Sequence, residues 1–169
     1  IIVIDNLRGI GNGKIFPAGP LRTKSDIAIK ECDALISIGD NDCKDFTIIQ
    51  NATSNNKPIF KAKIKLVSTL KNTEYFAFSA IGNPDKFFST LVNNGANIKH
   101  TRIFPDHHQF TKDEILELKT IAIKNNYTLI TTKKDYVKIH DTEKIDCAVV
   151  DIVFENKPEF IKLINETLS

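Results

Sequence analysis

An aspartate followed by two histidines is the group of residues best suited to chemistry in this sequence. Asp106, His107 and His108 follow the pair Phe104-Pro105 at the end of an apolar segment, and binding and catalytic residues concentrate in such loops. An aspartate beside an imidazole can orient the ring for proton transfer or act as its electrostatic partner. The same trio could bind a metal. Neighbours in an extended segment point to opposite faces, so we expect the two histidines to serve different sites, which weakens the metal interpretation.

A glycine-rich stretch offers a second candidate site. Gly11 and Gly13 lie in residues 8–14, and the segment that follows ends at Arg22. Glycine lets the backbone turn tightly and approach a ligand closely, but the stretch lacks the lysine and serine or threonine that end a phosphate-binding loop. A structural turn is the favoured interpretation of the glycines alone. Arg22 is suited to grip a phosphate with two N–H donors, or to form a surface ion pair of little energetic value.

Two further stretches join a strand pattern directly to a helix pattern. One contains Gly82 and Asn83, and the other contains Thr132, Lys134 and Asp135. Ligands of α/β proteins bind at the carboxyl ends of strands, and a helix N-terminus presents free N–H groups to an anion. Lys134 could hold a phosphate. The alternative for both stretches is a capped helix with solvated lysines.

The elements that must position these residues alternate along the chain. Short apolar strands and amphipathic helices follow one another, which is typical of a layered α/β fold. We expect strands at residues 1–5, 34–38, 58–66, 75–81, 98–103, 127–131 and 147–154. We expect helices at residues 25–31, 43–51, 84–93, 112–125 and 158–168. Thr111 with Glu114 predicts a capping box, and Asn83 before Pro84 predicts an N-cap.

The polar turn at residues 51–58 predicts a boundary between two lobes. We therefore expect a first lobe at 1–57, a second at 58–155 and a last helix at 156–169 that packs on either lobe. After the boundary, Lys61, Lys63 and Lys65 fall on one face of a strand. They either solvate an edge strand or form a basic face toward phosphates or lipid headgroups.

Composition excludes some classes of protein. The chain has 169 residues, 41% apolar and 26% charged, with a net charge of +2, which is ordinary for a globular protein and too small a charge to argue for nucleic acid. No apolar run approaches the length of a membrane span. The three cysteines lack metal or redox spacing and are expected to be free thiols. The chain contains no methionine and opens on the apolar run Ile-Ile-Val-Ile, so we expect it to start inside a larger protein.

Together, these stretches resemble the tetraacyldisaccharide 4′-kinase family of Gram-negative lipid A synthesis. That family has Gly-Asn-Gly-Arg running into Pro-Ala-Gly-Pro-Leu-Arg-Glu, then Gly-Ile-Gly-Asn-Pro-Glu-Arg-Phe-Phe, then Phe-Pro-Asp-His-His and finally Thr-Glu-Lys-Asp. The counterparts here are residues 11–14, 17–23, 80–88, 104–108 and 132–135. The resemblance runs from about residue 5 to about residue 138. The motifs at residues 80–88 and 104–108 are the most specific to the family.

The resemblance implies transfer of the γ-phosphate of ATP to the 4′-hydroxyl of a tetraacyldisaccharide 1-phosphate. It implies a P-loop-kinase-like sheet remnant followed by a smaller α/β lobe, with Mg²⁺ bridging the ATP phosphates. By resemblance the catalytic group is His107 with Asp106 and His108, and Arg22, Gly11 and Gly13 contact the nucleotide. Gly82, Asn83 and Lys134 contact the lipid substrate, and no residue is assigned to a metal. The implied location is the cytoplasmic face of the bacterial inner membrane, as a peripheral protein, or the cytoplasm for a fragment.

The sequence also departs from the family pattern. Gly-x-x-x-x-Gly-Lys-[Ser/Thr] is absent, and by resemblance this loop and the catalytic aspartate lie upstream of Ile1. Thr23 replaces the glutamate after Pro-Leu-Arg, which puts an acidic Mg²⁺ contact in doubt, and Lys133 reverses one charge. Lys14 and Lys86 replace arginines and cannot form the same planar fork.

Two alternatives stay open. A non-catalytic α/β binding fragment of a split or decayed gene is compatible with the missing loop and methionine. A metal-dependent hydrolase would be built on the Asp-His-His group with His100 or His140, and it predicts a bound transition metal.

Overall fold

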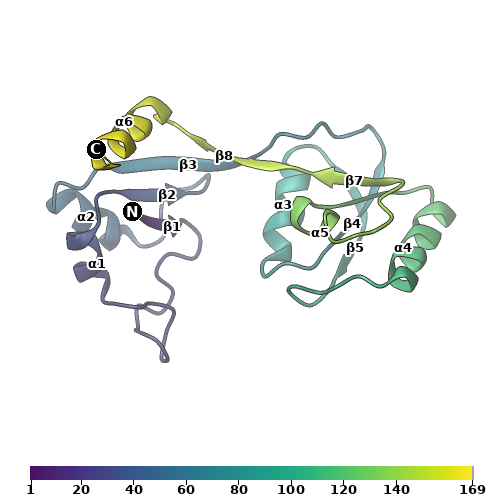
Figure 1. Cartoon of the computed structure of the whole chain (residues 1–169), viewed down its shortest axis with the longest axis horizontal. Coiled ribbons are helices and arrows are strands. Elements are labelled where there is room, and N and C mark those ends of the chain that lie inside the picture. Colours follow the sequence, from purple (N-terminus) through teal and green to yellow (C-terminus); the bar gives the residue numbers. More distant parts are fainter. Residues whose placement is uncertain (169) are drawn as a thin grey trace. The chain divides into compact units, whose positions relative to one another are not determined.

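The structure, a computed structural model, describes residues 1–168 as parts of two compact units. The first unit comprises Ile1–Ile64 and the C-terminal segment from Ile152, and the second comprises Lys65–Asp151 (Figure 1). The first of these segments ends at Ile64, inside the strand β3 (Ile59–Leu66). The sequence places the boundary earlier, at the polar turn of residues 51–58. That turn only connects a helix to the strand that follows, and the strand still pairs within the first unit.

The first unit is a parallel α/β sheet with one added strand. Its elements are β1 (Ile2–Asp5), α1 (Ser25–Glu31), β2 (Leu35–Ile38), α2 (Phe46–Ser54), β3 (Ile59–Leu66), β8 (Val150–Phe154) and α6 (Lys157–Leu168). The strand order is β1-β2-β3-β8, and β2 pairs in parallel with both β1 and β3. Strand β2 is nearly all apolar, as a strand covered on both faces must be.

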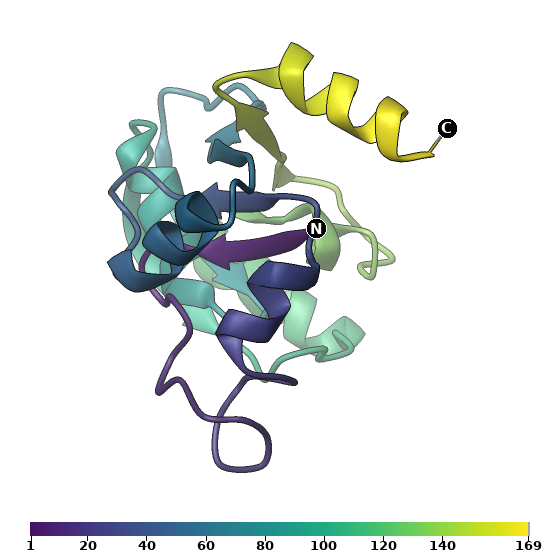
Figure 2. The same cartoon turned by 90° about the vertical axis from the view of Figure 1, so that its left-hand side faces the viewer.

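Helices cover both faces of this first sheet (Figure 2). One core cluster joins Ile4 and Leu35 to Ile29 of α1 and Ile48 of α2. The opposite cluster joins Ile36, Phe60 and Ala62 of the sheet to residues of β8 and α6. The last helix therefore packs within the first unit.

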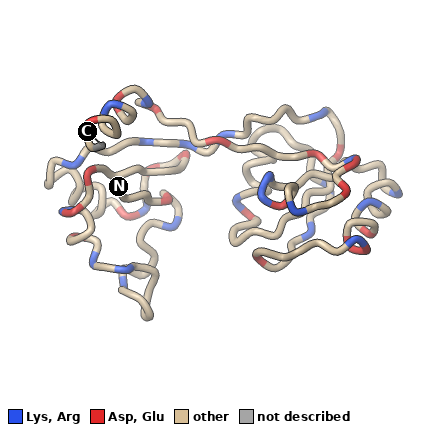
Figure 3. Tube along the Cα trace, in the orientation of Figure 1, with Lys and Arg blue, Asp and Glu red and all other residues tan. Residues whose placement is uncertain are grey.

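The lysines of β3 alternate with apolar residues as expected. Phe60 and Ala62 are buried, whereas Lys61 is exposed and its Nζ lies 3.7 Å from a carboxylate oxygen of Asp42. Lysines recur along this strand in Figure 3. Exposed ion pairs of this kind contribute little to stability, so the contact between Lys61 and Asp42 adds little to the fold.

The second unit is an all-parallel sheet. Its elements are β4 (Glu74–Ser79), α3 (Pro84–Asn93), β5 (Asn97–Ile103), α4 (Lys112–Lys124), β6 (Thr128–Thr132), α5 (Lys133–Tyr136) and β7 (Ile145–Ala148). The strand order is β5-β4-β6-β7. Strand β4 lies inside the sheet, and its residues from Tyr75 to Ser79 are completely shielded from solvent. Its alternate side chains enter two different cores, one with Leu91 of α3 and one with Leu118 of α4.

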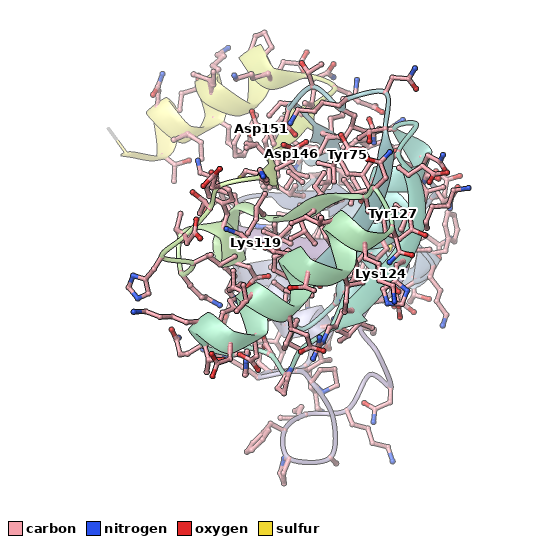
Figure 4. The ribbon with its side chains drawn as sticks, turned by 90° about the vertical axis from the view of Figure 1, so that its right-hand side faces the viewer. Tyr75, Lys119, Lys124, Tyr127, Asp146 and Asp151 are labelled. Atoms are coloured by element: carbon pink, nitrogen blue, oxygen red, sulfur yellow. The ribbon has the colours of Figure 1, made fainter. Side chains whose placement is uncertain are left out.

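A polar contact closes the amino end of this sheet. The buried Tyr75 accepts a hydrogen bond at its hydroxyl from the Lys71 backbone N–H, 2.7 Å away. Lys71 Nζ in turn pairs with Asp146 of β7 at 2.5 Å (Figure 4). Burial raises the pKa of the Tyr75 phenol, so the hydroxyl stays protonated at neutral pH.

Most expected elements are present, and one expectation is wrong. Helices α1 and α3 have the expected bounds, whereas α2 begins at Phe46 rather than Cys43. The single strand expected at 147–154 is two strands, β7 and β8, which belong to different sheets. Val149 separates them: its carbonyl accepts the Val67 N–H at 2.8 Å, and its N–H donates to the Ser68 hydroxyl at 3.1 Å.

Both expected helix caps are confirmed. Thr111 and Glu114 form the two reciprocal bonds of a capping box at α4. The Asn83 side chain accepts the Lys86 N–H at α3, 3.3 Å away, with Pro84 at the first helical position. Among the described residues, no helix combines the length and the apolar character needed to cross a membrane.

Shortening Phe160 to alanine tests how α6 is held. Its ring stacks on Phe154 at 4.4 Å between centroids and meets Phe60 edge-on at 5.2 Å. We expect Phe160→Ala to lower the free energy of unfolding of the first unit by about 1–3 kcal/mol, below the cost for a full core position because the ring is half-buried. Hydrogen exchange of β2 amides measures this. Ile161→Ala, at a side chain that is 47% exposed, is the control, and equal losses would contradict the packing role.

Candidate functional site

Three loops meet at the carboxyl edge of the second sheet. Because β4 pairs in parallel with both β5 and β6, the segments after all three strands emerge at one edge. The loop after β5 lies along the end of β4: the Phe104 N–H donates to the Ser79 carbonyl at 2.9 Å, and the His107 N–H donates to the Ala80 carbonyl at 3.2 Å. The three motifs that the sequence singles out in this unit are therefore neighbours.

The Asp106 carboxylate lies at the centre of this edge. One oxygen is 3.8 Å from His107 Nε2, and the other is 3.7 Å from Lys134 Nζ. A methyl group added at Gly82 would lie 3.3 Å from the same carboxylate, so glycine there leaves room for it. The structure thus brings together Asp106, His107, Lys134 and Gly82. We call these four residues the edge cluster.

The edge cluster is open to solvent. The side chains of Asp106, His107 and Lys134 are 46%, 74% and 49% exposed. At 3.7–3.8 Å the polar atoms of these side chains are farther apart than hydrogen-bonded partners. A cation, an imidazole and a carboxylate can therefore all reach a ligand in the same place, which suits an anionic or hydroxyl-bearing substrate.

His107 owes its position to its backbone. Its φ of 63° is in the left-handed region, where histidine occurs more often than most residues. Its N–H also lies 3.0 Å from an oxygen of Asp106. The two histidines do separate as expected, but a left-handed turn causes this rather than the alternation of an extended strand.

His108 is not part of the edge cluster. Its ring stacks on the buried Phe104 at 5.1 Å, and its Nε2 lies 3.0 Å from both carboxylate oxygens of Glu114. These contacts connect the loop to the capping box of α4. The geometry therefore does not group His108 with His107 in one catalytic set, because the His108 ring packs on Phe104 whereas the His107 ring is exposed beside Asp106.

Glu114 is the strongly shifted acid near this site. The Thr111 backbone N–H and the His108 ring lower the pKa of its carboxyl from 4.5 to about 2. Both contacts favour the charged carboxylate. Asn83 likewise has a local task, since its side-chain oxygen is used by the α3 cap beside Gly82.

The sequence did not single out Asp135 as more than a helix-terminal charge. The structure buries its side chain completely, and its oxygens accept from the Ala80 N–H at 2.8 Å and from the Thr132 hydroxyl at 2.9 Å. Lys138 Nζ lies 3.1 Å from its second oxygen. The spacing Thr-x-x-Asp, which is a helix-start signature, was the available signal.

The predicted nucleotide contacts of the first unit lie in the segment between β1 and α1. Gly11 and Gly13 have φ angles of 66° and 69° in a loop closed by Asn12, whose side-chain N–H donates to the Ala18 carbonyl at 2.8 Å. Arg22 instead lines a cavity of about 490 Å³ that these two glycines do not border. The positive φ angles explain why glycine occupies these two positions. The contact between this loop and a nucleotide stays a prediction.

A second cavity lies at the carboxyl ends of β1 and β2. It has a volume of about 320 Å³ and is bordered by Asn6, Ser37, Phe46, Lys61 and Lys63, among others. The buried Ser37 hydroxyl donates to the Asn6 side chain at 2.6 Å. Sequence reasoning missed this pair, although polar residues at the ends of buried strands are a usable signal.

The histidine, cysteine and carboxylate side chains do not gather into a metal site in the part of the chain that the structure describes. In residues 1–168 no group of three or more histidine, cysteine, aspartate or glutamate side chains is placed to hold a metal ion. Asp106, His107 and His108 therefore do not form the site that a metal-dependent hydrolase needs. No such group marks a site for a resident Mg²⁺ among these residues either.

Comparison with known proteins identifies the family. The model of the family described as tetraacyldisaccharide-1-P 4′-kinase matches residues 1–169. The chain belongs to this family. Proteins named tetraacyldisaccharide 4′-kinase are 39% identical over 144 residues in Chelativorans sp. and 43% identical over 141 residues in Brucella anthropi. These alignments cover 84% and 82% of this chain but 42% and 41% of those proteins.

The family match extends to the fold. The chain is 39% identical over 170 residues to the Rickettsia canadensis family member, covering 99% of this chain and 50% of that protein. A crystal structure described as apo-form LpxK from Aquifex aeolicus in complex with ATP is similar with a TM-score of 0.63 and 22% identity. It covers 97% of this chain and 50% of that chain, and at this identity the likeness shows the fold alone. The chain spans about half the length of the relatives it matches.

Removing the charge of Glu114 tests the link between His108 and α4. The folded-state pKa is lower than the ordinary value of 4.5, so Glu114 stabilises the fold above that pH and loses the contribution as the pH falls toward 2. We expect Glu114→Gln, which can keep the capping box, to flatten the decline in the free energy of unfolding across this range. Urea unfolding at several pH values measures it. Asp113→Asn, in the same turn, is the control and should keep most of the wild-type slope.

Proposed function

We propose that this chain is part of a lipid kinase that transfers the γ-phosphate of ATP to the 4′-hydroxyl of a tetraacyldisaccharide 1-phosphate, giving the 1,4′-bisphosphate. The observation that carries the proposal is the family match over the whole chain. The edge cluster supports it, because a histidine, a carboxylate and a lysine lie together at the sheet edge where α/β proteins bind ligands.

His107 is the residue we assign to the chemistry. In the reaction a bond forms between the 4′-oxygen and the γ-phosphorus, the bond to ADP breaks, and the hydroxyl loses its proton. Catalysis of such a transfer depends on positioning and on neutralising charge rather than on covalent chemistry. In this proposal the His107 ring, oriented by Asp106, supports an aspartate from the rest of the intact protein as that proton departs.

Lys134 and Gly82 are assigned to the lipid substrate. Lys134 Nζ is half-exposed beside Asp106, so its charge can reach a phosphate of the disaccharide. Gly82 supplies the space beside that carboxylate. In this proposal Asn83 acts indirectly, because its side chain caps α3 and so fixes the turn that contains Gly82.

The first unit is assigned to the nucleotide. We propose that residues 1–64 are part of the nucleotide-binding lobe, with Arg22 and the glycine loop toward the ATP phosphates. Mg²⁺ would bind together with ATP and would neutralise the charge of its phosphates. The intact protein would act as a peripheral protein at the cytoplasmic face of the inner membrane, where its lipid substrate lies.

This chain alone is proposed to be inactive. It has no Gly-x-x-x-x-Gly-Lys-[Ser/Thr] sequence, and without such a loop the β- and γ-phosphates are not held. The same absence supports the second candidate, a non-catalytic α/β binding fragment. The two candidates differ in whether activity returns when the rest of a family kinase is supplied.

A chimaera tests the proposed activity. In it, this chain replaces the matching half of the Rickettsia canadensis relative, which aligns with 99% of the chain. We expect ATP-dependent phosphorylation of a tetraacyldisaccharide 1-phosphate by the chimaera and none by the 169-residue chain alone.

Within the chimaera, His107→Ala should lower kcat by roughly 10²-fold or more, which is the usual contribution of a group that assists proton transfer. His140→Ala is the matched control, because that histidine is exposed in the same unit and outside the edge cluster. An inactive chimaera with an active parent would favour the binding fragment. Equal activity of the two variants would contradict the role of His107.

A further inference from the structure

Asp135 is a fully buried carboxylate whose contacts reach beyond its own helix. It lies in the first turn of α5, and burying such a group costs free energy unless its oxygens are satisfied. Three donors reach the oxygens of this carboxylate. Lys138 Nζ lies 3.1 Å from one oxygen, and the Thr132 hydroxyl and the Ala80 N–H lie 2.9 Å and 2.8 Å from the other. Separately, the Asp135 backbone N–H donates to the Thr132 hydroxyl oxygen at 3.1 Å, which caps the helix.

The bond to Ala80 differs from the others. Thr132 and Lys138 are three residues from Asp135, so their contacts only cap α5, whereas Ala80 is 55 residues away, in the loop after β4. A cap of α5 requires only the local bonds. The Asp135 carboxylate therefore fastens the turn after β6 to the turn after β4.

The peptide of Ala80 carries this connection to the candidate catalytic residue. Its N–H donates to Asp135, and its carbonyl accepts the N–H of His107 at 3.2 Å. His107 holds a left-handed φ of 63°, a conformation that persists only where surrounding contacts support it. Two residues after Ala80 comes Gly82, whose place beside Asp106 depends on the same turn.

We propose that Asp135 is a positioning residue for the edge cluster, acting through the Ala80 peptide to set His107 and Gly82 against Asp106 and Lys134. The inference rests on the proposed kinase function for its catalytic consequence. Asp135 touches no substrate in this scheme. It holds buried backbone groups in one arrangement, so that a surface-exposed imidazole has a defined position without being buried itself.

Asp135→Asn is the sharpest substitution, since it keeps size and shape. A carboxylate accepts at both oxygens, but an amide accepts at one and donates at the other. Ala80 and Thr132 address one oxygen and Lys138 addresses the other, so either orientation of the amide leaves a donor facing a donor. Asp141→Asn is the matched control, because Asp141 is an exposed carboxylate that pairs with Lys119 at 2.7 Å on α4 (Figure 4).

The first measurement is amide hydrogen exchange in the 169-residue chain, which requires no kinase activity. We expect Asp135→Asn to speed exchange at Ala80 and His107 by at least tenfold and to leave Leu118 and Leu129, in the core beneath, unchanged. Asp141→Asn should alter none of the four. Uniform acceleration of all four amides would mean a loss of global stability alone and would overturn the proposal, as would unchanged exchange at His107.

The second measurement is the kinetics of the chimaera. We expect Asp135→Asn to lower kcat by about 10- to 100-fold, the usual cost of displacing a catalytic group by a fraction of an ångström to an ångström, with KM for ATP unchanged. If Asp135→Asn alters hydrogen exchange at His107 but the chimaera keeps its normal kcat, the positioning role is overturned and the proposed kinase function is not. A wild-type chimaera without activity overturns the proposed function instead, and with it the catalytic part of this inference.

Discussion

The parallel hydrogen-bonded ladder on both sides of β4 is the constraint on which the second unit depends. A strand with neighbours on both edges and helices on both faces has no exposed surface, so its residues from Tyr75 to Ser79 are all shielded from solvent. Parallel pairing also directs the carboxyl ends of β4, β5 and β6 to one edge. The same ladder that builds the core therefore gathers the residues of the edge cluster.

Charge in this unit is distributed according to burial. Exposed pairs such as Asp106 with Lys134 are weakly held and free to exchange partners with a ligand. The buried carboxylate of Asp135 is fully bonded, because an unsatisfied charge in that position would be costly. A fully bonded polar group below the surface and an exposed one above it is an arrangement suited to binding an anionic ligand without distorting the fold.

The first unit is also built on parallel strands, but a helix from the end of the chain completes it. Its parallel strands also place polar residues, Asn6 and Ser37, at their carboxyl ends beside a cavity. It adds α6, which returns from the far end of the chain to cover one face through Phe154 and Phe160. Each unit is therefore a small α/β layer with its own core. The proposal made above assigns nucleotide binding to one layer and lipid binding to the other.

The sequence by itself determined the local structure and the family. Capping residues Thr111 and Asn83 act within one helical turn, so their effect can be read from spacing, and the motifs around residues 80–88 and 104–108 identify the family correctly. Only the tertiary structure divided residues 147–154 between two sheets, gave His107 the left-handed backbone that turns it away from His108, and made Asp135 a link to Ala80. These three outcomes depend on contacts between residues far apart in the chain or on a single left-handed backbone angle, and neither is encoded in the periodicity or spacing of neighbouring residues.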